Sequence, residues 1–160
     1  MKALIIYDSA YGNTQKLAEA IQSVLPSDQT SLLKADKFDP QQLSGVELLV
    51  IGTPTYGGRP TPQVQACLKQ IPSGQKGLKA LVFDTGMPKE MQKAFLKLVI
   101  GFFGYASPKL ALALEAKGVE VIGQETFFVL GKEGPLQDGE IDRVKDWVRN
   151  NLSIKQESGK

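Results

Sequence analysis

Ile5-Ile6-Tyr7-Asp8-Ser9-Ala10-Tyr11-Gly12-Asn13-Thr14 joins an apolar run to an amphipathic segment. The run at 2–7 contains Ile and Tyr, which is typical of a buried strand. From Gln15 onward, apolar residues such as Leu17 and Ile21 recur at helical spacing, which predicts a helix. A turn rich in hydroxyl groups therefore connects a strand to a helix.

This turn has the chemistry of a phosphate cradle. The start of a helix exposes unpaired N–H groups with a partial positive charge, and Gly12 lets the backbone approach an anion closely. An ordinary capped turn is the alternative, because Asn and Thr are common at such positions. Neither a Walker A sequence nor GxGxxG is present, so a dinucleotide site has little support. The candidate residues are Ser9, Ala10, Tyr11, Gly12, Asn13 and Thr14.

Composition restricts the function classes. The 160 residues suit one domain at 1–152 with a polar tail at 153–160. A net charge of +2 argues against nucleic-acid binding. Without histidine there is no Ser-His-Asp triad or His-based zinc site, and we expect no metal site.

The apolar patch at 95–105 is too short to span a membrane, and no leader pattern is seen, so we expect a cytoplasmic protein. Cys67 is expected to pack in the core.

Predicted strands and helices alternate along the chain. Strands are predicted at 2–7, 30–34, 46–52, 78–83 and 119–130, the last interrupted at Gly123. Helices are predicted from Gln15, from Thr61, over 89–100, from Ser107 to Gly118 and from Asp138 to about Asn151. Such alternation indicates an α/β fold, a parallel sheet with helices on both faces.

Three loops follow the carboxyl ends of the strongest strands, at 8–14, 53–60 and 84–88. Each combines glycine with hydroxyl side chains. Ligands of parallel α/β sheets bind at this edge, where the strand order reverses. The three loops therefore predict one shared site.

The loops resemble those of the flavodoxin family. Residues 9–14 resemble the family's phosphate loop, and Gly52-Thr53-Pro54-Thr55-Tyr56-Gly57 resembles the loop in which an aromatic residue flanks the flavin. Phe83-Asp84-Thr85-Gly86 resembles the third loop. The segment 127–140 is similar to a poorly characterised branch of flavodoxin-domain proteins.

The resemblance implies a three-layer, doubly wound, five-stranded sheet in the order 2-1-3-4-5, with FMN as cofactor. Tyr56 would stack on the ring. Arg59 would stabilise an anionic reduced ring, or else be a solvated loop charge. Asp84 is expected to bond within its own loop. Beyond the phosphate loop, the candidate cofactor-binding residues are Pro54, Thr55, Tyr56, Gly57, Gly58, Arg59, Asp84, Thr85 and Gly86.

The chain also departs from the family pattern. It is slightly basic, and Met87-Pro88-Lys89 replaces the usual Gly-Asp and stacking Tyr of the third loop. An additional segment spans 89–106, and its Phe102-Phe103-Gly104-Tyr105 stretch would cover either the core or the second face of the flavin.

Three functions stay open at this point. The first is an electron carrier between redox proteins. The second is an NAD(P)H- or quinol-linked quinone oxidoreductase with the same FMN site. The third is a non-redox binding domain that has lost flavin. Redox proteins or small quinone-type acceptors are the expected partners, and the oligomeric state is open.

Overall fold

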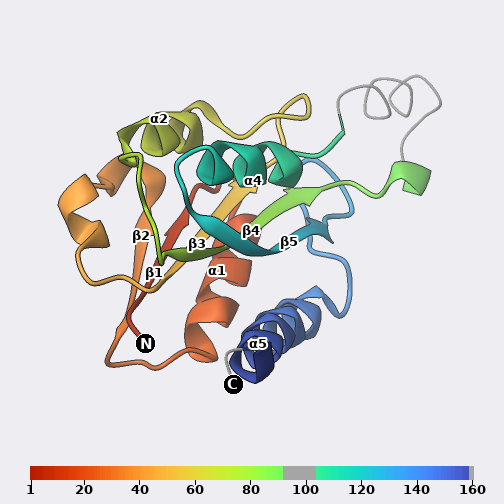
Figure 1. The fold of residues 1–160 in the computed structure, drawn as a ribbon. Helices are drawn as coiled ribbons and strands as arrows, with labels where there is room; N and C mark the ends of the chain where they lie inside the picture. Colours follow the sequence, from red (N-terminus) through yellow and green to blue (C-terminus); the bar gives the residue numbers. More distant parts are fainter. Residues whose placement is uncertain (92–103, 159–160) are drawn as a thin grey trace.

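Five parallel strands form the central layer in the computed structural model, which describes residues 1–91 and 104–158 (Figure 1). The strands are β1 (Ala3–Tyr7), β2 (Thr30–Lys34), β3 (Leu48–Pro54), β4 (Lys79–Gly86) and β5 (Glu120–Phe128). Their order is β2-β1-β3-β4-β5, and every neighbouring pair is parallel. The predicted fold class and strand order are confirmed.

Helices cover both faces of this sheet. They are α1 (Asn13–Ser23), α2 (Pro62–Gln70), α4 (Ser107–Glu115) and α5 (Glu140–Ser158). Helices α1 and α5 lie on one face, and α2 and α4 lie on the other (Figure 1). Short 3₁₀ turns occur at Ala35–Lys37, Pro40–Leu43 and Lys89–Met91. No helix in the described part of the chain is long and apolar enough to cross a bilayer.

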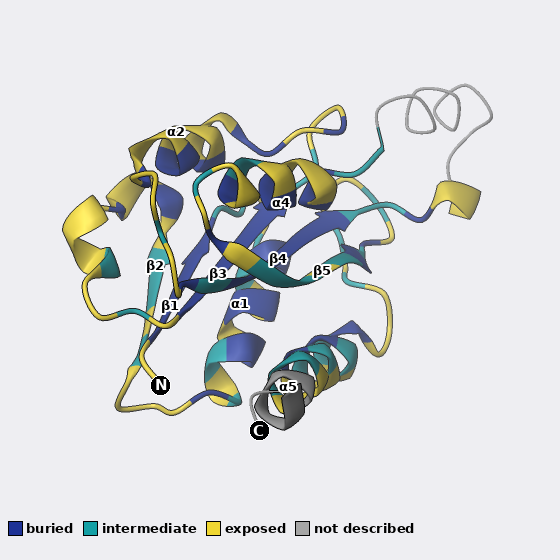
Figure 2. Cartoon of the chain, viewed as in Figure 1, coloured by how far each residue is buried: buried dark blue, intermediate teal, exposed yellow. Residues whose placement is uncertain are grey.

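Two apolar clusters lie on the two faces of the sheet, whose central strands are buried (Figure 2). The cluster under α2 and α4 includes Val64, Cys67 and Leu110. Cys67 is fully buried, as predicted, and burial raises the pKa of its thiol to about 12. The start of α2 is as predicted: Thr61 accepts a hydrogen bond from the N–H of Val64, and Pro62 is its first residue.

Strand β5 corrects one expectation, because it runs through Gly123 without a break. The pairing shifts register between Ala80 and Leu81, so the irregularity is a bulge. A Cβ at Gly123 would lie 2.7 Å from Leu81 Cδ2 and 2.8 Å from Asn151 Cγ. The absence of a side chain at Gly123 therefore lets β5 and α5 approach each other closely.

Some element boundaries also differ from prediction. β3 and β4 continue through Pro54 and Gly86, so the second and third loops begin as strand. Helix α5 runs to Ser158 and does not end near Asn151. Of the helix predicted at 89–100, only Lys89–Met91 is described, as a 3₁₀ turn. The rest of that helix, with Phe102 and Phe103, lies outside the described residues.

Candidate functional site

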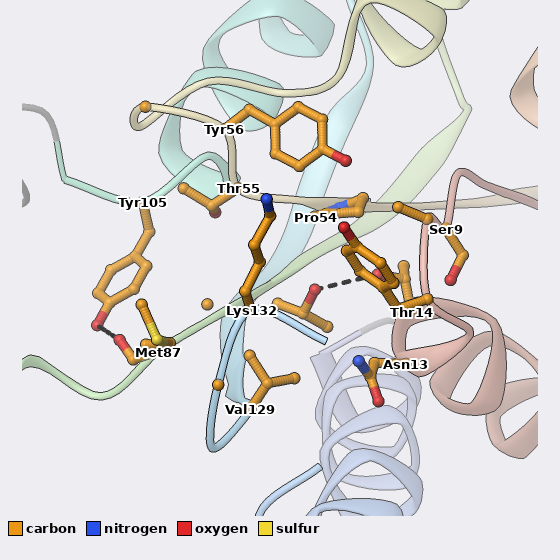
Figure 3. A pocket seen from close by; sticks show the side chains of 16 residues that line it. Ser9, Asn13, Thr14, Pro54, Thr55, Tyr56, Met87, Tyr105, Val129 and Lys132 are labelled. Carbon is orange, nitrogen blue, oxygen red and sulfur yellow. Dashed lines mark hydrogen bonds between the residues drawn. The ribbon is translucent and has the colours of Figure 1, made fainter. Parts of the chain in front are cut away.

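A cavity of about 600 Å³ opens at the carboxyl ends of the strands, where the strand order reverses at β1 (Figure 3). This volume is typical of a site for a small organic ligand. Segments following β1, β3, β4 and β5 line it, together with Tyr105 just before α4. The three predicted loops thus meet, and a fourth segment joins them.

The first wall is the turn between β1 and α1. Its lining residues are Ser9, Ala10, Tyr11, Asn13 and Thr14. Gly12 does not line the cavity, but it is the N-cap residue, with a φ of +88°, and no side chain caps the helix. Ser9 Oγ accepts a hydrogen bond from the N–H of Gly12 at 3.0 Å. The N–H groups of the first helical turn therefore face this end of the cavity without a side-chain cap.

The hydroxyl groups of Thr14 and Thr85 join the first and third loops. Their Oγ1 atoms lie 3.0 Å apart, and both residues are buried (Figure 3). Thr85, Gly86 and Met87 line the cavity from the end of β4. The contact holds the start of α1 against the sheet.

The second wall is a small hairpin after β3. Its lining residues are Pro54, Thr55, Tyr56 and Gly57. Tyr56 and Arg59 exchange backbone hydrogen bonds of 2.9 and 3.0 Å. Gly57 and Gly58 have φ values of +56° and +77°, as a type I′ turn requires. Tyr56 lines the cavity and is 50% exposed. Gly58 and Arg59 do not line the cavity, and Arg59 is exposed.

Asp84 lies behind the cavity wall, fully buried in β4. Its carboxylate accepts hydrogen bonds from Thr55 Oγ1, from Thr126 Oγ1 at 2.7 Å and from the N–H of Ala106 at 3.1 Å. The expectation that it bonds within its own loop is wrong, because β4 extends past it and points it at neighbouring segments. Burial raises the pKa of this carboxyl group, and no ion pair in the described chain involves it.

Tyr105 lines the cavity, although its stretch was expected to cover the core ahead of the second face of the flavin. Its hydroxyl donates to the carbonyl of Met87 at 2.9 Å. A Cβ at Gly86 would lie 2.8 Å from Tyr105 Cε1, so the ring rests on the backbone of β4. An edge-to-face contact with Phe128, at 6.4 Å between centroids, fixes it further.

The segment after β5 forms the fourth wall, which the sequence analysis assigned to no ligand role. Val129, Gly131 and Lys132 line the cavity. Leu130 N–H donates to the carbonyl of Pro135 at 2.8 Å. The side-chain amide of Asn13 donates to the carbonyl of Glu133 at 3.2 Å. The loop 129–136 is thereby held over the start of α1. It contains Gly131 and Gly134 but none of the hydroxyl side chains that accompany glycine in the other three loops.

Solved structures with this fold include flavodoxins. Flavodoxin 1 from Bacillus cereus is 19% identical with a TM-score of 0.73, covering 96% of this chain and 98% of that chain. A flavodoxin from the domain Archaea is 17% identical with a TM-score of 0.71, covering 96% and 98%. Rubredoxin oxygen:oxidoreductase from Desulfovibrio gigas is 18% identical with a TM-score of 0.72, and the match covers 97% of this chain but 36% of that one.

Sequence comparison addresses the family directly. No curated protein shows significant similarity to this sequence. The family model described as flavodoxin matches residues 5–147, which is nearly the whole chain. The chain therefore belongs to the flavodoxin family, for which FMN is the cofactor and electron transfer the role.

Proposed function

We propose that the cavity binds FMN and that the chain works as an electron carrier between redox proteins. The uncapped start of α1 at one end of the cavity carries the proposal. The residues present fit the cofactor at both of its ends, the phosphate and the ring.

At the phosphate end, the donors are neutral. The first turn of α1 has no acidic residue and no side-chain cap. Asn13 and Thr14 are buried polar residues at that turn, and a Cβ at Gly12 would meet nothing within 4 Å. Each hydrogen bond to a charged acceptor contributes about 1.5–3 kcal/mol, so several neutral donors suffice for a phosphate.

At the ring end, the cavity is bordered by flat and apolar side chains. Tyr56 and Tyr105 would contact the ring, and Val129 and Met87 add apolar surface. Tyr105 would supply the second aromatic contact that the third loop lacks. Its hydroxyl bond to Met87 keeps the ring in place without a ligand.

When bound, FMN supplies one- and two-electron redox chemistry. The chain's own residues orient it and exclude water from its inner side, because the strand ends behind the cavity are buried. Tyr56 is half-exposed, so the mouth of the cavity stays accessible to a redox partner.

The first test is a titration of flavin-stripped protein with FMN, followed by flavin fluorescence, with riboflavin as control. We expect tighter binding of FMN than of riboflavin. Thr14→Val should weaken FMN more than riboflavin, and equal losses would contradict the phosphate assignment. Thr30→Val is the matched control. Thr30 is the first residue of β2 and lies at the amino ends of the strands, away from the cavity. Absence of FMN binding would favour the third candidate function, a non-redox binding domain that has lost flavin.

A second assay separates a carrier from an enzyme. Steady-state oxidation of NADH or NADPH is followed with a quinone acceptor and the FMN-loaded protein. We expect no turnover above that of free FMN. Sustained turnover would instead assign the chain as a quinone oxidoreductase.

A further inference from the structure

Lys132 is the charged residue among those that line the cavity in the described part of the chain. The other lining residues are neutral, including all the donors around α1. Arg59, which was predicted either to stabilise the reduced ring or to be a solvated loop charge, lies outside the lining, and both Arg59 and Lys132 are exposed. A positive charge is thus present at the cavity, but it comes from a different loop.

No ion pair in the described structure involves Lys132. The ion pairs found there join Arg143 to Glu125 and Glu140, and Arg149 to Asp146. Glu133, its sequence neighbour, contributes its backbone carbonyl to Asn13 and forms none of these pairs. An ammonium group outside any ion pair is available to a negatively charged ligand.

The backbone of Lys132 is held in place. Gly134 N–H donates to the carbonyl of Gly131 at 3.2 Å, and Leu130 N–H donates to that of Pro135 at 2.8 Å. The Asn13–Glu133 bond fastens the same loop to α1. The lysine stem is flexible, but it starts from a fixed point on the cavity edge.

The direction of the side chain distinguishes the two ends of the cavity. In Figure 3, Lys132 extends across the cavity toward Thr55 and Pro54, and away from Asn13. Thr55 and Pro54 lie next to Tyr56, at the end assigned to the ring. Asn13 belongs to the end assigned to the phosphate.

We propose that Lys132 is the cation of the flavin site and acts on the ring, where it stabilises the negative charge of the reduced cofactor and raises its reduction potential. The inference rests on the proposed FMN function. A redox partner supplies two electrons, and uptake of these with one proton by a neutral ring leaves one negative charge. A cation a few ångströms away stabilises that charge and leaves the neutral oxidised ring nearly unaffected.

The test compares Lys132→Gln with two other charge-removing variants. Arg59→Gln removes the cation that the sequence offered as a candidate, and Lys109→Gln removes an exposed charge on α4. For each protein, the dissociation constants of oxidised FMN and riboflavin are measured by fluorescence, and the midpoint potential is measured at low and high salt.

We expect Lys132→Gln to leave binding of oxidised FMN within about twofold and to weaken reduced FMN by roughly tenfold. For a two-electron couple, that tenfold change corresponds to a potential lower by about 30 mV. Lys132→Arg should keep the wild-type potential, Lys109→Gln should not change it, and high salt should shrink the difference between wild type and Lys132→Gln.

Three results would overturn the proposal. Loss of FMN affinity with unchanged riboflavin affinity and unchanged potential would place Lys132 on the phosphate. A potential shift in Arg59→Gln and none in Lys132→Gln would show that Arg59, and not Lys132, stabilises the negative charge of the reduced ring. Equal shifts in Lys132→Gln and Lys109→Gln would indicate a general surface charge effect. Failure of the wild-type protein to bind FMN would instead refute the proposed function itself.

Discussion

The side-chain amide of Asn13 donates a hydrogen bond to the carbonyl of Glu133, 3.2 Å away and 120 residues along the chain. This bond connects the first turn of α1 to the loop after β5. Gly134 packs against the same amide, and a Cβ there would lie 2.7 Å from Asn13 Oδ1. This contact thus links the phosphate end of the cavity to the loop that carries Lys132.

Gly134→Ala is predicted to weaken flavin binding by displacing this loop. The added methyl group would push the Asn13 side chain away from Glu133 and shift Val129 and Lys132. Gly139→Ala is the matched control, because both glycines have positive φ, +104° and +87°, but nothing lies within 4 Å of a Cβ at Gly139. Backbone strain costs on the order of 1 kcal/mol in each variant.

The measurement is the dissociation constant of FMN in the two variants at matched temperature, beside thermal unfolding. We expect similar loss of stability and roughly tenfold weaker FMN binding in Gly134→Ala alone, since the displaced loop carries part of the cavity wall. Equal FMN affinities would show that the loop does not shape the site.

Gly52→Ala is predicted to destabilise the protein strongly. Gly52 lies opposite Phe83 in the β3–β4 register, and a Cβ would lie 2.1 Å from Phe83 Cζ. Edge-to-face contacts with Phe127 and Trp147 hold the ring of Phe83, so it cannot move aside freely. Overpacking of this kind costs typically 1–3 kcal/mol, and we expect about 3.

A double-mutant cycle with Phe83→Leu tests the cause by urea unfolding. Replacing the ring should recover at least about 1 kcal/mol of the loss in Gly52→Ala, because residues in direct contact couple. Simple additivity of the two losses would mean that the ring is not the obstacle.

Cys67 is predicted to be unreactive in the native protein. It is fully buried, and burial raises the pKa of its thiol to about 12, so the reactive thiolate is scarce at neutral pH. Modification by an aromatic disulfide reagent should proceed only through unfolding, at a rate independent of reagent concentration. The same protein in denaturant should react completely within minutes. Fast native labelling would contradict the burial.

Local patterns explain which parts of the site were predictable. Hydroxyl and glycine residues after apolar strands marked Ser9, Thr55 and Thr85, and a parallel sheet brings such strand ends together. The strand order itself was inferred from the family resemblance. Lys132 was not predicted as a site residue. It follows β5, an edge strand, and its loop is held at the cavity by the contact with Asn13, which is distant in sequence. No local pattern encodes such a contact.

Distant contacts also explain why the predictions for Asp84 and Gly123 were wrong. Asp84 stands before Thr85-Gly86, which looks like a loop, but the pairing of β4 with β5 continues to Gly86 and Phe128. Gly123 looks like a strand break, although its missing side chain makes room for Leu81 and Asn151. In both cases tertiary packing overrides the local signal.

Asp84→Asn is predicted to change how stability depends on pH. Burial raises the pKa of the Asp84 carboxyl above its ordinary value of about 3.9, despite the hydrogen bonds from Thr55, Thr126, Ser107 and Ala106 that lower it. The folded state then holds a proton that the unfolded state has lost. Stability from this group is therefore complete below the ordinary pKa and is lost as the pH rises through the raised, folded value.

Asparagine does not titrate, so the unfolding free energy of Asp84→Asn minus that of wild type should rise with pH from about 4 and then level off. Urea unfolding at a series of pH values measures this difference. Asp36→Asn corrects for removing one exposed carboxyl group. A difference that falls with pH would mean that the four hydrogen bonds outweigh burial, because a lowered pKa makes the ionised carboxylate stabilising. A rising difference means that the buried carboxylate costs stability at neutral pH, while it holds the start of α4 beside the cavity.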